Sequence, residues 1–179
     1  MRLADKVAIV TGAGSGFGEG IATRFAAEGA RVVVNDVDSA NGERVAAAIR
    51  LAGGQATFVR ADVSRGDDVK ALLQATLATY GRLDIQINNA GVSHRNQSML
   101  TVPEDEFDRV YAVNVKSLYW TAQHMAPHFR DNGGGVFINI ASTGGVRPRP
   151  GLVWYNGTKG AVIVTSRAMA VELAPHRIR

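Results

Sequence analysis

The sequence contains no cysteine and little that is aromatic, with 5 prolines and 7% aromatic residues among 179. Without cysteine there is no disulfide framework, no thiolate metal site and no cysteine nucleophile. No run approaches the roughly 20 consecutive apolar residues that span a bilayer. The first residues, Met1 to Lys6, lack the apolar core of a signal peptide. We therefore expect a cytoplasmic protein with no metal site and no membrane partner.

The excess of positive charge is also small, because 20 Lys and Arg stand against 16 Asp and Glu, for a net charge of +4. The basic residues are scattered singly, and the densest groups are Arg147-Pro148-Arg149 and His176-Arg177-Ile178-Arg179. Neither matches the patch that neutralising a phosphate backbone requires. Salt-sensitive nucleic-acid binding stays as an alternative, but we favour a mildly basic surface with no nucleic-acid partner.

Short β-branched runs alternate with longer helical patterns along the whole chain. At 46% hydrophobic residues the chain can build one sizeable core. Glycines stop several helices, and we expect Ser39 and Ser64 to cap two of them. The pattern predicts strands over 6–11, 31–36, 56–60, 83–88 and 136–140, a sixth strand opening at 177–179, and helices over 17–28, 39–52, 64–80, 104–130 and 153–173.

Apolar strands separated by helices predict a parallel sheet that is covered on both faces. Right-handed crossovers then make a Rossmann-like, doubly wound α/β sheet. With no repeat and no linker, we expect residues 1–179 to form one dinucleotide-binding domain.

A glycine-rich segment, Thr11-Gly12-Ala13-Gly14-Ser15-Gly16-Phe17-Gly18, follows the first predicted strand. Glycines there let the backbone approach a pyrophosphate, whose charge meets the N–H groups at the start of the next helix. A plain tight turn uses the same residues, but the flanking strand and helix favour a cofactor site. We expect Gly12, Ser15, Gly16, Phe17 and Gly18 to bind the cofactor.

Asp36 ends the second predicted strand. A carboxylate at this position accepts hydrogen bonds from the adenosine ribose and repels a 2′-phosphate. No basic residue stands at Ser15 or Val37 to hold such a phosphate. The sequence therefore favours NAD over NADP, although Asp36 as a simple turn cap remains an alternative.

Tyr155 and Lys159 lie four residues apart near the start of the last predicted helix, so they share one face. A free phenol is a poor base at neutral pH, and a neighbouring ammonium favours the phenolate. Ser142 follows the fifth predicted strand, at the sheet edge where ligands bind in such folds. Its hydroxyl is placed to hold a substrate oxygen. A packing tyrosine and an ordinary loop serine are the alternatives.

Together these features resemble the short-chain dehydrogenase/reductase family, from Lys6 to Arg179. The resemblance rests on an ordered set of motifs: the glycine turn, Asn88-Asn89-Ala90-Gly91 after the fourth strand, Asn114 in the long helix, and Ser142 followed by Tyr155-xxx-Lys159. The spacing of 13 residues between Ser142 and Tyr155 also fits the family.

The resemblance implies a catalytic role for four residues. Tyr155 would be the general acid/base, and Ser142 would polarise the substrate oxygen. Lys159 would favour the Tyr155 phenolate and bind the nicotinamide ribose, and Asn114 would hold a water that relays protons from Lys159. The remaining cofactor contacts implied by the family are Asp62, Val63, Asn89, Ala90 and Gly91, with Asn88 and Thr11 as structural residues.

The implied activity is hydride transfer between a secondary alcohol or ketone, as the small-molecule substrate, and NAD. The resemblance also implies a homo-oligomer through the two long helices, a dimer here and a tetramer for longer members. Family members continue beyond the counterpart of Arg179, so the resemblance implies that a substrate lid and a last edge strand are missing. A catalytically inactive, dinucleotide-binding fragment is therefore the alternative to an active enzyme. Arg147 and Arg149 leave open an anionic substrate or a solvent-facing loop.

Overall fold

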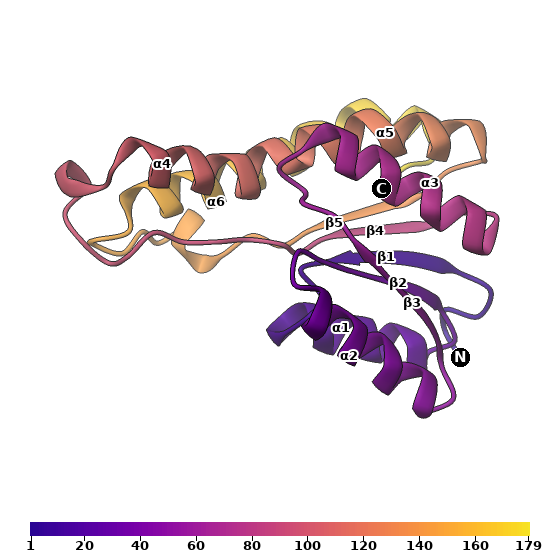
Figure 1. The fold of residues 1–179 in the computed structure, drawn as a ribbon. Helices are drawn as coiled ribbons and strands as arrows, with labels where there is room; N and C mark the ends of the chain where they lie inside the picture. The colour runs from indigo at the N-terminus through magenta and orange to yellow at the C-terminus, as the bar shows by residue number, and fades with distance from the viewer.

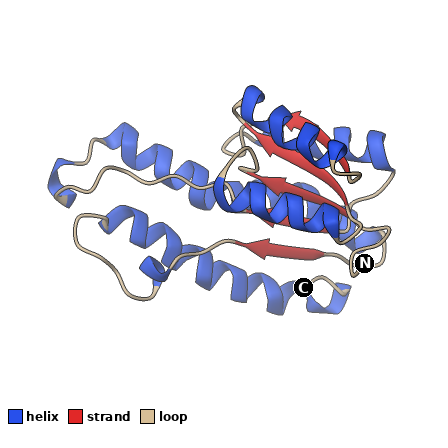
Figure 2. Ribbon diagram, turned by 90° about the horizontal axis from the view of Figure 1, so that it is seen from below, coloured by secondary structure: helices blue, strands red, loops and turns tan.

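The computed structural model describes residues 1–179 as a parallel five-stranded sheet between two layers of helices (Figures 1 and 2). The order of the strands is β3-β2-β1-β4-β5, and every pair is parallel. The strands are β1 (Val7–Thr11), β2 (Arg31–Asp36), β3 (Gln55–Arg60), β4 (Ile85–Asn88) and β5 (Val136–Asn139). The predicted Rossmann-like fold class is confirmed.

Two helical layers cover the two faces of the sheet, as Figure 1 shows. One layer holds α1 (Gly16–Ala27) and α2 (Ser39–Leu51). The opposite layer holds α3 (Gly66–Tyr80), α4 (Glu104–Tyr111), η2 (Ala112–Lys116), α5 (Ser117–Asp131) and α6 (Val153–Leu173). Short 3-10 turns complete the chain: η1 (Met99–Thr101), η3 (Thr143–Gly145) and η4 (Ala174–His176).

The strands separate two hydrophobic clusters because successive side chains point to opposite faces. Ala8 and Val10 of β1 pack toward α1 and α2, whereas Val7 and Ile9 pack toward α3 and α5. All five residues of β1 are buried. This explains why its sequence is a continuous apolar run rather than an alternating one.

The order of the strands reverses between β1 and β4. The chain moves outward from β1 through β2 to β3 and then returns to β4 on the other side of β1. The strands point toward an arm in which α4 and the start of α6 extend beyond the sheet (Figure 2). Ligands bind at such a switch point, outside the carboxyl ends of the strands.

Three local predictions were wrong. Asp38, not Ser39, caps α2, because its carboxylate accepts from Asn41 N at 3.0 Å. The third helix begins at Gly66 rather than Ser64, whose hydroxyl instead donates to Asp62 Oδ1 at 2.7 Å. The predicted helix over 104–130 is interrupted by η2, a turn of π-helix.

The predicted sixth strand is present only as a single parallel bridge between Ile178 and Gly135. Arg179 O accepts from Phe137 N at 2.8 Å, which places this segment beside β5. None of the helices combines the length and the apolar character that a membrane crossing requires.

Candidate active site

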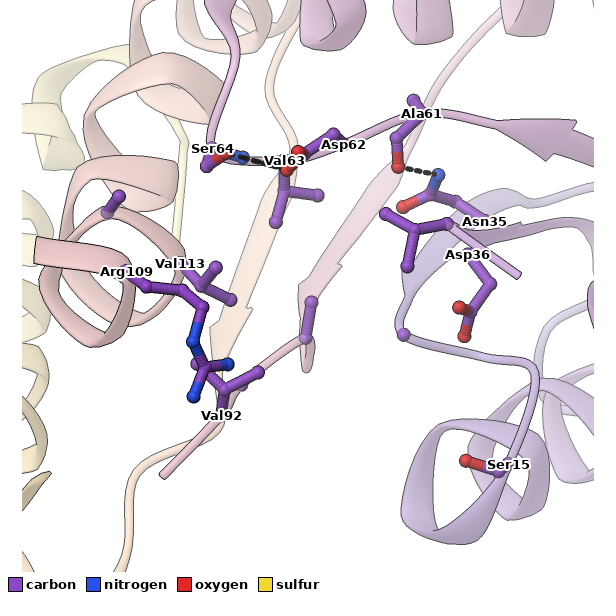
Figure 3. Close-up of a pocket in the computed structure, with 15 residues that line it drawn as sticks. Ser15, Asn35, Asp36, Ala61, Asp62, Val63, Ser64, Val92, Arg109 and Val113 are labelled. Atoms are coloured by element: carbon purple, nitrogen blue, oxygen red, sulfur yellow. Dashed lines mark hydrogen bonds between the residues drawn. The ribbon is translucent and has the colours of Figure 1, made fainter. Parts of the chain in front are cut away.

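A cavity of about 430 Å³ opens at the switch point, where the carboxyl ends of the strands meet α4 and η2 (Figure 3). Its wall comes from the turn after β1, the ends of β2 and β3, the segment after β4, and the helix across from them. The residues that line it are Gly12, Ser15, Asn35, Asp36, Val37, Ala61, Asp62, Val63, Ser64, Ala90, Gly91, Val92, Arg109, Ala112 and Val113.

The glycine turn requires glycine at specific positions. Gly12 and Gly16 have φ values of +59° and +55°, a region that L side chains rarely adopt. A Cβ on Gly18 would collide with Gly12 O and would lie 2.6 Å from Asn89 Nδ2. The first turn of α1 is thus packed directly on the loop. Ser15 and Phe17 are exposed at this turn, and Phe17 is 85% exposed.

Asp36 faces this turn from the end of β2. Its Oδ2 accepts from Gly14 N at 2.9 Å, and its Oδ1 accepts from Asp38 N at 3.0 Å. These bonds orient the carboxylate on the wall of the cavity. Since a carboxylate offers about four lone-pair sites, acceptor capacity remains for hydroxyl groups of a ligand.

The segment after β4 is tied to the glycine turn by two polar side chains. Thr11 Oγ1 donates to Ile87 O at 3.2 Å and accepts from Asn89 N and Ala90 N, both at 3.0 Å. Asn89 Nδ2 donates to Thr11 O at 2.8 Å and to Gly12 O at 3.0 Å. The side chain of Asn89 is thus engaged with the turn, while Ala90 and Gly91 line the cavity.

The far end of the cavity is formed by Asp62, Val63 and Ser64 after β3. Asp62 Oδ1 accepts from Ser64 N at 2.9 Å and from Ser64 Oγ at 2.7 Å, and Asp62 Oδ2 has no hydrogen bond. Asn35 Oδ1 is buried on the same wall without a partner. Unused acceptors beside an apolar Val63 suit a flat heterocycle that carries an amino group.

Tyr155 and Lys159 lie one turn apart on α6. Lys159 Nζ is 6.0 Å from the centroid of the Tyr155 ring, and it donates to Ile140 O at 2.8 Å. Lys159 is only 5% exposed, and this burial lowers the pKa of its ammonium from the ordinary value.

Ser142 lies two residues beyond that carbonyl, at the start of η3. Its Oγ accepts from Gly144 N at 3.1 Å, so its O–H remains free to donate. The bond from Lys159 to Ile140 O fixes the segment that carries Ser142 against the helix that carries Tyr155.

Asn114 is buried on η2, where the π-turn projects it toward the segment after β4. Its Oδ1 accepts from Val92 N, and its Nδ2 donates to Val92 O, both at 2.8 Å. Nδ2 also donates to Thr158 Oγ1 at 3.0 Å, and Thr158 Oγ1 donates to Tyr155 O at 2.7 Å. Asn114 is therefore connected to the helical turn of Tyr155.

Asn114 and Lys159 meet at Gly91. A Cβ added to Gly91 would lie 3.4 Å from both Asn114 Oδ1 and Lys159 Nζ. Since Gly91 also lines the cavity, the predicted catalytic residues on η2 and α6 come together at its end.

The structure thus brings the predicted residues into two adjoining groups. Gly12, Ser15, Asp36, Asp62, Val63, Ala90 and Gly91 line the cavity, and Asn114 and Lys159 adjoin it at Gly91. The other predicted site residues are not on its wall: Gly16, Phe17, Gly18, Asn89, Ser142 and Tyr155. Motif reasoning did not find Val92, Arg109 or Val113 on the wall. The residues from α4 and η2 carry no sequence signal beyond their helical spacing to Asn114. Arg147 and Arg149 are exposed.

The sequence was compared with known protein families and with individual relatives. A family model for short chain dehydrogenases matches residues 6–179. The chain belongs to the short-chain dehydrogenase family. It is 49% identical to the 4-formylbenzenesulfonate dehydrogenase of Comamonas testosteroni, over 100% of this chain and 71% of that protein. It is 39% identical to the 2-(R)-hydroxypropyl-CoM dehydrogenase of Xanthobacter autotrophicus, over 98% of this chain and 71% of that protein.

Solved structures of the family superpose closely on this short-chain dehydrogenase. A 3-ketoacyl-(acyl-carrier-protein) reductase from Brucella melitensis complexed with NADH has a TM-score of 0.95 at 49% identity, covering 99% of this chain and 73% of that one. An NAD+-bound xylitol dehydrogenase has a TM-score of 0.96 at 30% identity, covering 100% of this chain and 69% of that one. The short-chain dehydrogenase described here thus spans about 70% of the length of these relatives. It is a member of an oxidoreductase family, and both of these neighbours are solved with a nicotinamide dinucleotide.

Proposed function

We propose that this short-chain dehydrogenase interconverts a secondary alcohol and a ketone with NAD(H), and that Tyr155 is its general acid/base. The convergence of Asn114 and Lys159 on Gly91, beside the cavity and one helical turn from Tyr155, carries the proposal. Burying an ammonium costs free energy. If Tyr155 served only for packing, nothing in that role would explain the buried ammonium of Lys159 beside it.

The cavity fits a dinucleotide. The glycine turn is open at Gly16, where no atom lies within 4 Å of the Cβ position, so a pyrophosphate has room there, and Asp36 and Asp62 retain unused acceptor sites. We propose that Gly12, Ser15, Gly16, Phe17 and Gly18 bind the phosphate side, and that Asp62 and Val63 bind the adenine. Asn89, Ala90, Gly91, Tyr155 and Lys159 complete the proposed contacts with the riboses and the nicotinamide side.

We propose NAD rather than NADP as the cofactor. The Asp36 carboxylate is held in place by two backbone N–H groups and would repel a 2′-phosphate. The two solved relatives with NADH and NAD+ support this choice.

When bound, the nicotinamide supplies the hydride acceptor for oxidation and the donor for reduction. In the oxidation direction the phenolate of Tyr155 would accept the hydroxyl proton of the substrate. In reduction the same phenol returns the proton to the carbonyl oxygen. The O–H of Ser142, which is free because its oxygen already accepts from Gly144 N, donates to that substrate oxygen.

Lys159 and Asn114 support this proton transfer. The ammonium of Lys159 stabilises the phenolate electrostatically, and the low exposure of the site strengthens the effect. Asn114 Oδ1 has a second lone pair beyond its bond with Val92 N. We propose that this lone pair holds a water molecule through which Lys159 exchanges a proton with solvent.

Tyr155→Phe tests the proposal, with Tyr80→Phe as the matched control on the distant helix α3. NADH binding, followed by fluorescence titration, should weaken by no more than about 3-fold in Tyr155→Phe, the loss of one neutral hydrogen bond, and should not change in Tyr80→Phe. Turnover on a panel of secondary alcohols with NAD should fall by about 100-fold or more only in Tyr155→Phe. Activity retained in Tyr155→Phe would refute the role of the phenol. Binding without turnover in the unchanged protein would favour the alternative, an inactive dinucleotide-binding chain.

We also propose that the protein forms a homo-oligomer through α5 and α6. Apolar side chains on these helices face solvent, with Tyr119 53%, Val164 65% and Val171 79% exposed. Val164 and Val171 are two turns apart, so they form a stripe along α6. Sedimentation should show an oligomer that Val164→Asp dissociates, and a monomeric unchanged protein would contradict the assignment.

A further inference from the structure

The cavity wall carries few charged groups, and their net charge does not balance the negative charge of the proposed dinucleotide. Among its 15 residues only Asp36, Asp62 and Arg109 bear a formal charge. The wall therefore has one more negative than positive charge, whereas a dinucleotide brings two phosphate charges. The N–H groups of the glycine turn attract phosphate, but Arg109 is the one cationic side chain on the wall.

Arg109 reaches the wall from α4, on the side opposite the glycine turn. Figure 3 shows its guanidinium beside Val92, across the cavity from Asp36 and Ser15. Its Nη2 donates to Ser93 O at 3.2 Å. The nearest carboxylate, Glu106, is 4.0 Å away, and the side chain is 49% exposed. No other hydrogen bond engages the guanidinium, so most of its five N–H groups remain available.

We propose that Arg109 is a cofactor-binding residue whose guanidinium donates to a phosphate oxygen of the bound dinucleotide. The inference rests on the proposed function, because it takes this cavity to be the dinucleotide site. The bond to Ser93 O restricts the side chain before the ligand arrives, which reduces the entropy lost on binding. The planar guanidinium of arginine can donate to two phosphate oxygens at once. A lysine ammonium interacts with a phosphate only as a point charge.

Titration of the whole chain with three ligands tests the assignment. NADH binding is followed by fluorescence, and ADP-ribose and adenosine are measured by competition or calorimetry. ADP-ribose retains the two phosphates without the nicotinamide, and adenosine has neither. The variants are Arg109→Gln, Arg109→Lys and, as control for the loss of one surface cation, Lys70→Gln on α3, where the lysine is exposed.

We expect Arg109→Gln to weaken NADH and ADP-ribose binding by about 3- to 10-fold, the effect of one partly exposed charge-assisted hydrogen bond. Adenosine binding should not change. The affinity of Arg109→Lys for NADH and ADP-ribose should lie between that of the unchanged protein and that of Arg109→Gln. The loss should shrink as salt is added, because the guanidinium is half exposed.

Two results would overturn the assignment while the proposed function stands. One is NADH binding by Arg109→Gln that is as tight as that of Lys70→Gln. The other is a loss of adenosine affinity as large as the loss of NADH affinity, which would make Arg109 a structural part of the wall. If the unchanged chain binds neither NADH nor ADP-ribose, both the proposed function and the role of Arg109 are refuted.

Discussion

The carboxylate of Asp36 accepts a hydrogen bond from the backbone N–H of Gly14 at 2.9 Å. A side chain at the end of β2 therefore holds the turn that follows β1. The approach is close, since a Cβ on Gly14 would lie 2.9 Å from Asp36 Oδ2. The same carboxylate is proposed to bind the adenosine ribose, so cofactor selection and the shape of the glycine turn are coupled through one residue.

Replacing Asp36 should change both properties. Asp36→Ala removes the acceptor of Gly14 N and the repulsion of a 2′-phosphate, so NADH binding weakens and NADPH gains relative to it. We expect the ratio of the two dissociation constants to narrow by about 10-fold, the effect of one charge-assisted hydrogen bond. Parallel titrations with NADH and NADPH measure it, with Asp5→Asn as a control that removes an exposed carboxylate before β1, at the opposite end of the sheet. An unchanged ratio would contradict the assignment of Asp36.

Two glycines of α1 should respond oppositely to alanine. In Gly18→Ala the methyl group meets Gly12 O, so we expect a loss of about 1–3 kcal/mol in the free energy of unfolding, together with weaker NADH binding. Gly20 has open space at its Cβ position and lies in the helix interior. Gly20→Ala should therefore stabilise by up to about 1 kcal/mol. Urea unfolding measures both, and a shift of the same sign and size in the two would show that the close packing of Gly18 does not matter.

Asn114 should matter more for stability than its partner Thr158. Asn114→Ala removes three hydrogen bonds and leaves both backbone polar groups of Val92 without that partner, so we expect a loss of about 2–4 kcal/mol. Thr158→Val keeps the two bonds to Val92 and should cost about 1 kcal/mol. Urea unfolding compares the two variants. Equal losses would mean that the bonds to Val92 contribute little and that η2 is held by other contacts.

Asp84 should make stability depend on pH at the opposite end of the sheet. Burial raises the pKa of this carboxyl, but hydrogen bonds from Arg82 and Val7 N, together with nearby positive charge, outweigh it and leave the pKa below its ordinary value. A lowered pKa in the folded state stabilises the protein above the unfolded pKa of about 4, and this contribution is lost as the pH falls through the folded pKa.

The variant Asp84→Asn isolates that contribution. We expect it to unfold more easily by about 1 kcal/mol at pH 7, because solvent screens part of the interaction. The difference from the unchanged protein should shrink as the pH falls below about 4, where Asp84 takes up a proton. Urea unfolding at several pH values measures it. A difference that stays constant down to low pH would show that the charge of Asp84 is not the cause.

The predictions from local pattern were right where one segment suffices. The buried run of β1 and the left-handed Gly81 that ends α3 follow from residues within a few positions. The π-turn at η2 could not be predicted in this way. Within this turn Asn114 forms hydrogen bonds with Val92 and Thr158, which are 22 and 44 residues away in the chain. A helical pattern through the same residues carries no sign of those partners.

The sequence by itself determined the parallel α/β architecture, the glycine turn and the identities of Asp36, Ser142, Tyr155 and Lys159 as candidate site residues. Hydrophobic period and glycine position act locally, so they can be read from the chain. Only the tertiary structure decided that Asn89 holds the turn, that Asn114 and Lys159 meet at Gly91, and that Arg109 faces the cavity. These relationships join side chains from different elements, and the packing of helices against the sheet sets their distances.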